Sequence, residues 1–208
     1  MSLATSSQPL CQHYDLAMLD LDGVVYIGAD AVPGAASALA AAQAAGMALA
    51  YVTNNASRPP ADIAEHLRVL GMPGVKDTDV VTSAQAVAHL IANAVPPGSE
   101  ILVVGGQGLY EALQERGLRG VDTFGPETSA VVQGFHPDVS WRLLAEGTYA
   151  VNAGLPWFAS NLDLSVPTTR GMAPGNGALV QLIAGATGRR PIVAGKPEAA
   201  LFAETTHG

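Results

Sequence analysis

Two aspartates one residue apart follow a short apolar run in the segment AMLDLDGVVY, residues 17–26. Side chains two residues apart in an extended chain point the same way, so Asp20 and Asp22 would share one small volume. Carboxylates that close together repel each other unless a proton or a cation neutralises them, and Mg²⁺ is a hard cation that takes oxygen ligands. An Asp-Gly pair between apolar residues is also a strong signal for a hairpin turn. A ligand site and a turn are therefore both consistent with this segment.

Polar residues also follow two other predicted strands. Thr53, Asn54 and Asn55 offer a hydroxyl, side-chain amides and backbone donors, all of which suit phosphate oxygens. The same residues are typical of a strand-to-helix loop, where Asn favours turn and capping geometry. Lys196 can pair with a carboxylate and with a phosphate and hold both against their mutual repulsion. Lysines in loops are more often simply solvated, but the chain has only one other lysine, Lys76.

Several familiar catalytic motifs do not occur in the sequence. It has no Gly-x-Ser-x-Gly elbow and no His-Glu-x-x-His helix, and its five histidines are scattered, so serine hydrolase and histidine-zinc chemistry lack support. The segment GGQGLYE, residues 105–111, has Glu111 where a dinucleotide fingerprint needs its last glycine or alanine. VAGKPE has Pro197 where a Walker phosphate loop needs Ser or Thr. The first segment is interpreted as a tight turn, and the second does not fit a Walker loop.

The elements that would position these residues follow a regular order. Short apolar runs alternate with longer Ala/Leu segments, which predicts strands alternating with helices. The predicted strands are 16–19, 47–52, 80–82, 101–104, 130–133, 157–160 and 192–194, and the predicted helices are 35–45, 60–70, 85–94, 109–116, 139–146, 179–186 and a last one after Pro197. Because parallel strands need helical crossovers, we expect an α/β protein with a parallel sheet that binds ligands beyond the carboxyl ends of its strands.

Residues 94–100, AVPPGSE, predict a hinge between two α/β passages, because two prolines and a glycine interrupt the periodic pattern. One domain inserted into another and two domains in tandem both fit this order. Hydrophobic residues make up 49% of the 208, enough for a substantial core. Residues 1–13 are polar at the start, and we expect them to be disordered or derived from a tag.

Charge and cysteine content narrow the classes of partner. Eighteen acidic and ten basic residues leave a formal charge of −8, which disfavours nucleic acids and anionic membranes as partners. Small phosphorylated metabolites remain possible, because a local lysine, amide cluster or metal ion can outweigh the overall charge. The single cysteine, Cys11, excludes an intrachain disulfide, and a cytoplasmic location is expected. No stretch predicts a membrane span or a signal peptide.

Three motifs, LDLDGVVY, YVTNNASR and VAGKPE, resemble in order and spacing the first three motifs of the haloacid dehalogenase superfamily. The chain is similar to its NagD and nitrophenylphosphatase branch, and the segments VVTSAQA, VVQGF, ASNLDLSVPTTRG and PGNGAL resemble that branch's cap and linkers. Glycerol-3-phosphate and phosphoglycolate phosphatases are the members it resembles most. The resemblance implies a Rossmann-like parallel-sheet core over 14–96 and 184–208, an inserted α/β cap over 97–183, and a possible homodimer through the cap.

The resemblance also implies a role for each candidate residue. Asp20 would be the nucleophile that forms an aspartyl-phosphate, and Asp22 would protonate the leaving group and then activate water. Mg²⁺ would bind Asp20 and the backbone carbonyl of Asp22. Lys196 would stabilise charge. The phosphate would be held by Thr53, Asn54 and Gly23, and the cap residues Asn161 and Asp163 would help to select the substrate.

Two expectations limit this interpretation. Asn161 and Asp163 also fit an Asn/Asp turn before Pro167. The superfamily's fourth motif, a Gly-Asp strand with another acid nearby, does not follow Lys196, where the only acids are Glu198 and Glu204. We therefore expect the 208-residue chain to bind Mg²⁺ weakly and to turn over poorly. The alternative to a phosphatase is a catalytically inactive relative that binds a phosphorylated metabolite.

Overall fold

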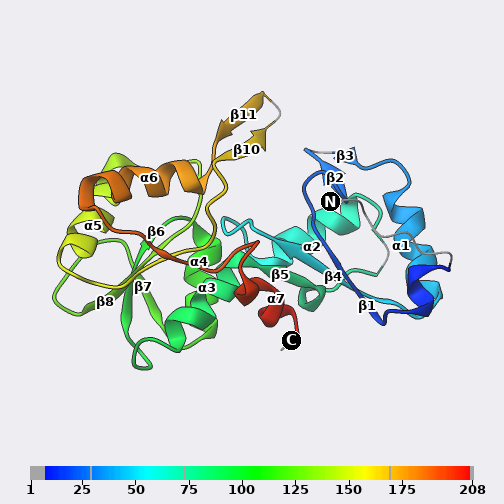
Figure 1. The fold of residues 1–208 in the computed structure, drawn as a ribbon, viewed down its shortest axis with the longest axis horizontal. Helices are drawn as coiled ribbons and strands as arrows, with labels where there is room; N and C mark the ends of the chain where they lie inside the picture. Colours follow the sequence, from blue (N-terminus) through cyan, green and yellow to red (C-terminus); the bar gives the residue numbers. More distant parts are fainter. Residues whose placement is uncertain (1–7, 29, 73, 169, 207–208) are drawn as a thin grey trace.

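The structure is a computed structural model that describes residues 8–28, 30–72, 74–168 and 170–206. It has two lobes, each built on a parallel β-sheet with helices against it (Figure 1). The α/β class expected from the sequence is confirmed. Of the stretch predicted as disordered, residues 1–7 lie outside the described part, and Leu10–Gln12 form one 3-10 turn, η1, in which Cys11 packs against the core of the first lobe.

The first lobe contains a three-stranded sheet in the order β1-β4-β5. Its strands are β1 (Leu16–Leu19), β4 (Ala48–Thr53) and β5 (Val80–Thr82), and its helices are α1 (Ala35–Ala44), α2 (Pro60–Val69) and the short η2 (Asp77–Asp79). Leu19 pairs with Tyr51 and Thr53 pairs with Thr82, so all three strands end at one edge of the sheet. α2 begins at Pro60 because proline lacks the N–H that the first turn of a helix leaves unpaired.

The second lobe contains a five-stranded parallel sheet in the order β12-β9-β8-β6-β7. Its strands are β6 (Glu100–Val104), β7 (Arg119–Val121), β8 (Thr128–Gln133), β9 (Trp157–Ala159) and β12 (Ile192–Val193). Its helices are α4 (Gln107–Glu115), α5 (Trp141–Asn152) and α6 (Asn176–Thr187). Alternate residues of β6 pack in two clusters: Ile101 and Val103 lie with Leu109 of α4, and Leu102 and Val104 lie with Ile183 of α6. The sheet is therefore covered on both faces.

Two helices join the lobes. α3 (Ser83–Ala92) begins where Thr82 and Gln85 exchange hydrogen bonds in a capping box, two residues before the predicted start. α7 (Ala199–Thr205) packs along α3 and contacts β4 and β5. Glu204 of α7 accepts a hydrogen bond from Arg116, the residue after α4, and pairs with His89 of α3 at 2.7 Å. The last helix thus ties the first lobe to the second.

Two small hairpins lie outside the sheets and were not predicted. β2 (Tyr26–Ile27) pairs with β3 (Asp30–Ala31), and β10 (Ser165–Thr168) pairs with β11 (Gly171–Pro174). Figure 1 shows the β10–β11 hairpin projecting from the second lobe on the side where the β2–β3 hairpin projects from the first. Both hairpins therefore flank the same side of the junction.

The domain division needs one shift from its predicted position. The boundary expected between residues 183 and 184 falls inside α6, which is one continuous helix. β12 was expected to be part of the core, but it pairs with β9 in the second sheet. We propose that the cap extends to Val193 and that the chain returns to the core with α7. Within the described ranges, no helix combines the length and the apolar character needed to cross a lipid bilayer.

Candidate functional site

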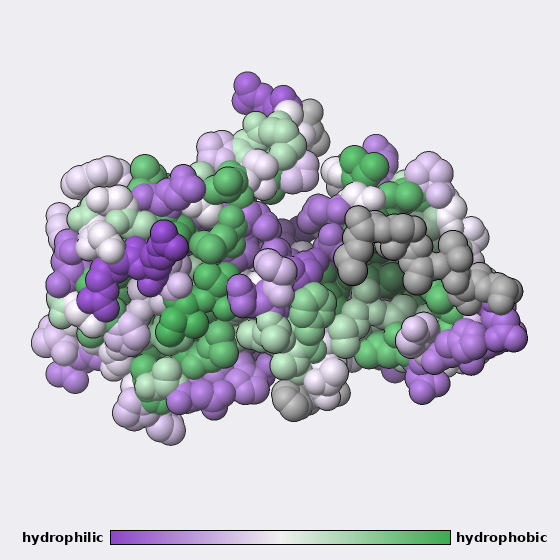
Figure 2. Space-filling model, viewed as in Figure 1, coloured by the Kyte–Doolittle hydropathy of each residue, from purple (hydrophilic) through white to green (hydrophobic). Residues whose placement is uncertain are grey.

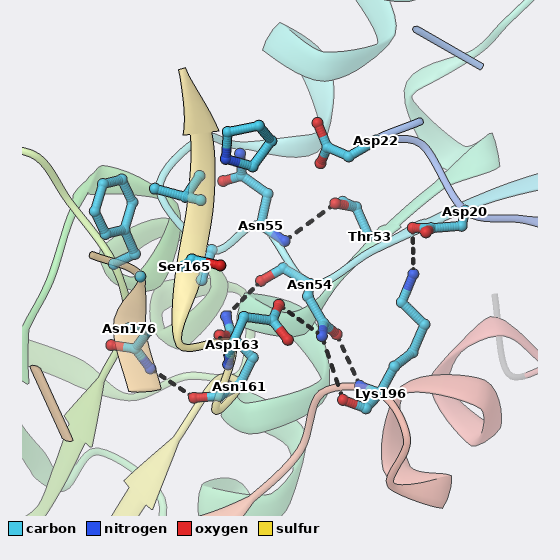
Figure 3. A pocket seen from close by; sticks show the side chains of 15 residues that line it. Asp20, Asp22, Thr53, Asn54, Asn55, Asn161, Asp163, Ser165, Asn176 and Lys196 are labelled. Carbon is cyan, nitrogen blue, oxygen red and sulfur yellow. Dashed lines mark hydrogen bonds and ion pairs between the residues drawn. The ribbon is translucent and has the colours of Figure 1, made fainter. Parts of the chain in front are cut away.

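A cavity of about 240 Å³ lies where the carboxyl ends of both sheets meet. Figure 2 shows hydrophilic residues gathered at the junction of the lobes, below the β10–β11 hairpin. The cavity is lined by Asp20, Asp22, Thr53, Asn54, Asn55, Ala56, Phe135, Asn161, Asp163, Ser165, Val166, Pro167, Gly175, Asn176 and Lys196. All of the predicted site residues except Gly23 are in this set, although they come from segments far apart in the chain (Figure 3).

Asp20 and Lys196 form an ion pair at the centre of the site. The Lys196 Nζ donates to Asp20 Oδ1 at 2.5 Å and to the carbonyl oxygen of Val52 at 3.0 Å. The same Asp20 oxygen accepts the backbone N–H of Leu21 at 2.9 Å. The Asp20 side chain is 50% exposed, whereas that of Lys196 is 23% exposed. The aspartate side chain therefore faces the cavity, and the less exposed lysine contacts it from the protein side.

Asp22 lies beside Asp20 in a turn that follows β1. The carbonyl of Leu21 accepts N–H groups from Val24 and Val25, and Gly23 has a φ of 80° that favours glycine. Asp22-Gly23 is therefore part of a turn, but not the loop of a hairpin, because β1 pairs with β4 in parallel. The two interpretations of this segment are therefore compatible, because it forms a turn and its Asp22 lines the cavity. Gly23 shapes the turn and does not line the cavity.

The pKa of the Asp22 carboxyl is raised above its ordinary value of 3.8, mainly because surrounding protein removes water from it. The negative charge of Asp20 adds to the increase, and the positive charges of Arg58 and Lys196 oppose it. Arg58 was not singled out from the sequence, although it ends the YVTNNASR motif. A raised pKa favours an aspartic acid that can hold and donate a proton.

Thr53 and the two asparagines after it occupy the end of β4. Thr53 is 1% exposed, and its Oγ1 accepts the backbone N–H of Asn55 at 3.0 Å. The Asn55 Oδ1 accepts from the backbone and the hydroxyl of Ser57, both at 2.8 Å. The loop interpretation is thus correct for Asn55. The Thr53 hydroxyl proton can still be donated toward the cavity, since only its oxygen is used in this contact.

The side-chain amide of Asn54 makes contacts on both sides of the site (Figure 3). Its Oδ1 accepts the backbone N–H of Lys196 at 2.7 Å, and its Nδ2 donates to Asp163 Oδ2 at 3.0 Å. Asn161 Nδ2 donates to the Asn54 backbone carbonyl at 2.7 Å, and Asp163 N–H donates to Asn161 Oδ1 at 3.1 Å. The predicted Asn/Asp turn is therefore present, and its residues also line the cavity.

Some lining residues were not identified from the sequence. Ser165, Val166 and Pro167 belong to β10, whose hairpin was not predicted, and Phe135 ends VVQGF; both segments were noticed only as resembling cap or linker motifs. Asn176 stands in the segment PGNGAL, which was noticed only as a cap motif. It is 1% exposed and donates to the carbonyl of Asn161 at 2.8 Å. Its buried amide could have been suspected only from the fold around it.

The donors at this site fit Mg²⁺. Asp20 and Asp22 provide oxygen ligands. Burial is the main cause of the raised pKa of Asp22, and the repulsion from Asp20 that adds to it is one that a cation would relieve. Within the described ranges, no group of three or more His, Cys, Asp or Glu side chains is arranged to hold a metal ion. Mg²⁺ is commonly held by one or two carboxylates, waters and a substrate phosphate, so the Asp20 carboxylate and the backbone carbonyl of Asp22 are donors of a suitable kind.

Comparisons with known proteins agree with the fold. A family model described as haloacid dehalogenase-like hydrolase matches residues 17–119. D-glycerol 3-phosphate phosphatase of Mycobacterium tuberculosis is 42% identical over 195 residues, covering 94% of this chain and 54% of that protein. Acid sugar phosphatase of Staphylococcus saprophyticus is 35% identical over 187 residues, covering 90% of this chain and 71% of that protein.

Solved structures show the same relationship. Glycerol phosphate phosphatase from M. tuberculosis in complex with magnesium has a TM-score of 0.91 and 41% identity, covering 96% of this chain and 60% of that one. The p-nitrophenyl phosphatase of Archaeoglobus fulgidus has a TM-score of 0.83 and 27% identity, covering 92% and 72%. The chain spans 54% of the length of the M. tuberculosis phosphatase that it matches. By fold, motifs and shared sequence, the chain belongs to the haloacid dehalogenase-like hydrolases.

Proposed function

We propose that the protein hydrolyses small phosphate monoesters through an aspartyl-phosphate intermediate on Asp20. The observation that carries this proposal is the arrangement of three groups in one cavity: a half-exposed Asp20 paired with Lys196 at 2.5 Å, and a second aspartate, Asp22, beside it. A nucleophile, a charge-stabilising cation and a proton donor are the groups that a two-step phosphoryl transfer requires.

In the first step, a carboxylate oxygen of Asp20 attacks phosphorus as the bond to the leaving oxygen breaks. Asp22 donates its proton to that oxygen, which leaves as an alcohol, and its raised pKa favours the protonated form that this step needs. In the second step, Asp22 accepts a proton from water as the water attacks the aspartyl-phosphate. Phosphate is released, and both aspartates return to their starting states.

The surrounding residues would bind and orient the phosphate. We place the phosphate oxygens against the Thr53 hydroxyl and the Asn54 backbone, because the Asn54 side chain is already engaged with Lys196 and Asp163. Lys196 would balance charge on Asp20 and on the transferring group. The turn at Gly23 sets the path of the backbone beside them.

Mg²⁺ would be held by Asp20 and the backbone carbonyl of Asp22, and when bound it would screen the anionic nucleophile from the anionic phosphate. The magnesium complex of the M. tuberculosis relative supports this choice of ion. Glycerol phosphates, sugar phosphates and glycolate phosphate are the candidate substrates, and the names of the two curated relatives support the first two. Asn161 and Asp163 would face the non-phosphate part. A cytoplasmic location and a homodimer through the cap remain predictions.

A phosphate-release screen tests the proposal. The wild-type chain and Asp20→Asn would be assayed with glycerol, sugar, glycolate and nucleotide phosphates in the presence of Mg²⁺. We expect release by the wild type alone, and a covalent phosphoryl group on Asp20 in rapidly quenched samples examined by mass spectrometry. Asp15→Asn, an exposed aspartate just before β1, is the matched control and should retain activity. Phosphate binding with no release above the Asp20→Asn background would instead support the inactive relative.

A further inference from the structure

We propose that the Asn54 side chain is a positioning residue that couples the placement of Lys196 to the placement of the cap. This inference rests on the proposed function, because it assigns Asn54 an effect on the lysine of that reaction. Asn54 follows β4 in the first lobe, Lys196 follows β12, and Asp163 follows β9 in the second lobe. One amide therefore touches the ends of three strands from two sheets (Figure 3).

The Asn54 side-chain amide forms hydrogen bonds with both the backbone N–H and the backbone carbonyl of Lys196. Asn54 Oδ1 accepts the Lys196 N–H at 2.7 Å, and Asn54 Nδ2 donates to the Lys196 carbonyl at 3.3 Å. Fixing the backbone of Lys196 fixes the point from which its long side chain starts. From that point the ammonium reaches Asp20 at 2.5 Å and the Val52 carbonyl at 3.0 Å.

Gly195 provides separate evidence for this close contact. A Cβ at position 195 would lie 2.7 Å from Asn54 Oδ1 and 2.4 Å from the Ser160 carbonyl oxygen, both shorter than real Cβ contacts. The backbone before Lys196 therefore packs closely against both the Ser160 carbonyl and the Asn54 amide, and position 195 has no room for a Cβ.

On the cap side, the same amide nitrogen donates to Asp163 Oδ2 at 3.0 Å. The Asn54 backbone carbonyl accepts from Asn161 Nδ2 at 2.7 Å and from Ser83 Oγ at 2.6 Å. Asn161 is in turn held by Asn176 at the start of α6. The contact thus continues from the core strand β4 into a cap helix, so a shift of the cap would change the contacts of Asn54.

The number of N–H donors on the Asn54 side chain distinguishes a positioning role from direct binding of phosphate. An asparagine amide has two N–H donors, and those of Asn54 are directed to Asp163 and to the Lys196 carbonyl. The side chain has no further donor for a phosphate oxygen unless one of these contacts breaks. Its effect on the reaction is therefore exerted through Lys196 and Asp163.

Two variants test the coupling through kinetics. We expect Asn54→Ala to lower kcat on the order of 10-fold to 100-fold, as a misplaced lysine would, with KM changed less than about threefold. In a Lys196→Ala background, the same substitution should lower kcat by less than about threefold, because residues that act as one unit are not additive. Asn152→Ala, at the exposed end of α5, is the control for loss of an asparagine.

The double variant Asn54→Asp/Asp163→Asn tests the hydrogen bond between residues 54 and 163. It exchanges the amide and the carboxylate, so one donor and one acceptor remain. Asn54→Asp alone places two carboxylates together and should weaken substrate binding, whereas the exchange of amide and carboxylate should recover part of that loss. Equal losses from Asn54→Ala in the wild-type and Lys196→Ala backgrounds would overturn the proposal. So would an exchange variant no better than Asn54→Asp, with thermal melting showing that both are folded.

A measurement that does not depend on turnover separates this proposal from the proposed function. Hydrogen exchange should show a protected Lys196 amide in the wild type and faster exchange in Asn54→Ala, with amides of β4 and α3 unchanged. If the chain releases no phosphate but the Lys196 amide responds in this way, the positioning holds and the phosphatase proposal fails. A Lys196 amide that exchanges equally fast in both proteins would show that Asn54 does not hold it.

Discussion

The two sheets contribute to the site from very different surroundings. In the five-stranded sheet, Ile101 to Val104 of β6 are each 0% exposed, because helices cover both faces. In the three-stranded sheet, β1 is an edge strand, and its residues Leu16 and Met18 are each 38% exposed. Asp20 and Asp22 follow this exposed strand, whereas Asn161 and Asp163 follow the buried strand β9. Lys196 follows β12, an edge strand of the larger sheet in which Ile192 is 54% exposed.

This difference shows how the site divides its tasks. In the proposed reaction, the groups that contact the substrate and transfer protons follow the more open strand, where the Asp20 side chain is half exposed. The residues proposed to support them come from both sheets: Lys196 and Asp163 follow strands of the larger sheet, and Asn54 follows β4 of the smaller one. The ion pair between Asp20 and Lys196 joins the two parts across the junction.

Breaking that ion pair should have the largest effect. We expect Lys196→Ala to reduce phosphate release on the order of 100-fold to 1,000-fold, since the transferring group loses its charged partner. Lys76→Ala removes the only other lysine, which is exposed and outside the cavity, and should leave activity unchanged. Steady-state phosphate release measures both variants. Equal activity in the two would show that joining the sheets through Lys196 is not needed for the reaction.

The difference in burial predicts a difference in stability. Leu102→Ala in β6 should lower the free energy of unfolding by about 3 kcal/mol, because it leaves a cavity in a closed core. Leu16→Ala in β1 removes the same atoms from a half-exposed position and should cost about 1 kcal/mol or less. Urea denaturation followed by circular dichroism gives both values. A larger loss for Leu16→Ala would mean that β1 is more deeply packed than its exposure indicates.

The smallest effect concerns Asp22 and has a defined dependence on pH. Its pKa is raised in the folded state, so the protonated form is favoured by folding, and stability is lost as the pH rises through and above 3.8. Asp22→Asn cannot ionise and should melt at a slightly higher temperature than the wild type at pH 7, with the difference disappearing near pH 3. Melting in EDTA keeps metal ions out of the comparison.

Asp15→Asn controls for the loss of one negative charge from the same segment. If the wild type were more stable than Asp22→Asn at pH 7 without metal, the ionised Asp22 carboxylate would be stabilised in the folded protein. The repulsion from Asp20 would then be too weak to affect folding.

Much of the fold could be predicted from local patterns. All seven predicted strands are present within two residues of their expected limits, because buried parallel strands are continuous apolar runs. α5 continues to Asn152, six residues beyond the predicted end at Glu146, which lies just before Gly147. In the structure, a Cβ there would lie 2.9 Å from Val104, so this glycine allows close packing against β6 and does not end the helix.

The sequence by itself determined the elements and the chemistry at their ends. Apolar periodicity marks strands and helices locally, and it places Asp20, Asp22, Thr53 and Lys196 just after strands. Only the tertiary structure decided which sheet β12 joins and what Asn54 contacts. The partners of its amide lie 109 and 142 residues away in the chain. Such contacts depend on how the two sheets pack against each other, and no local pattern encodes that packing.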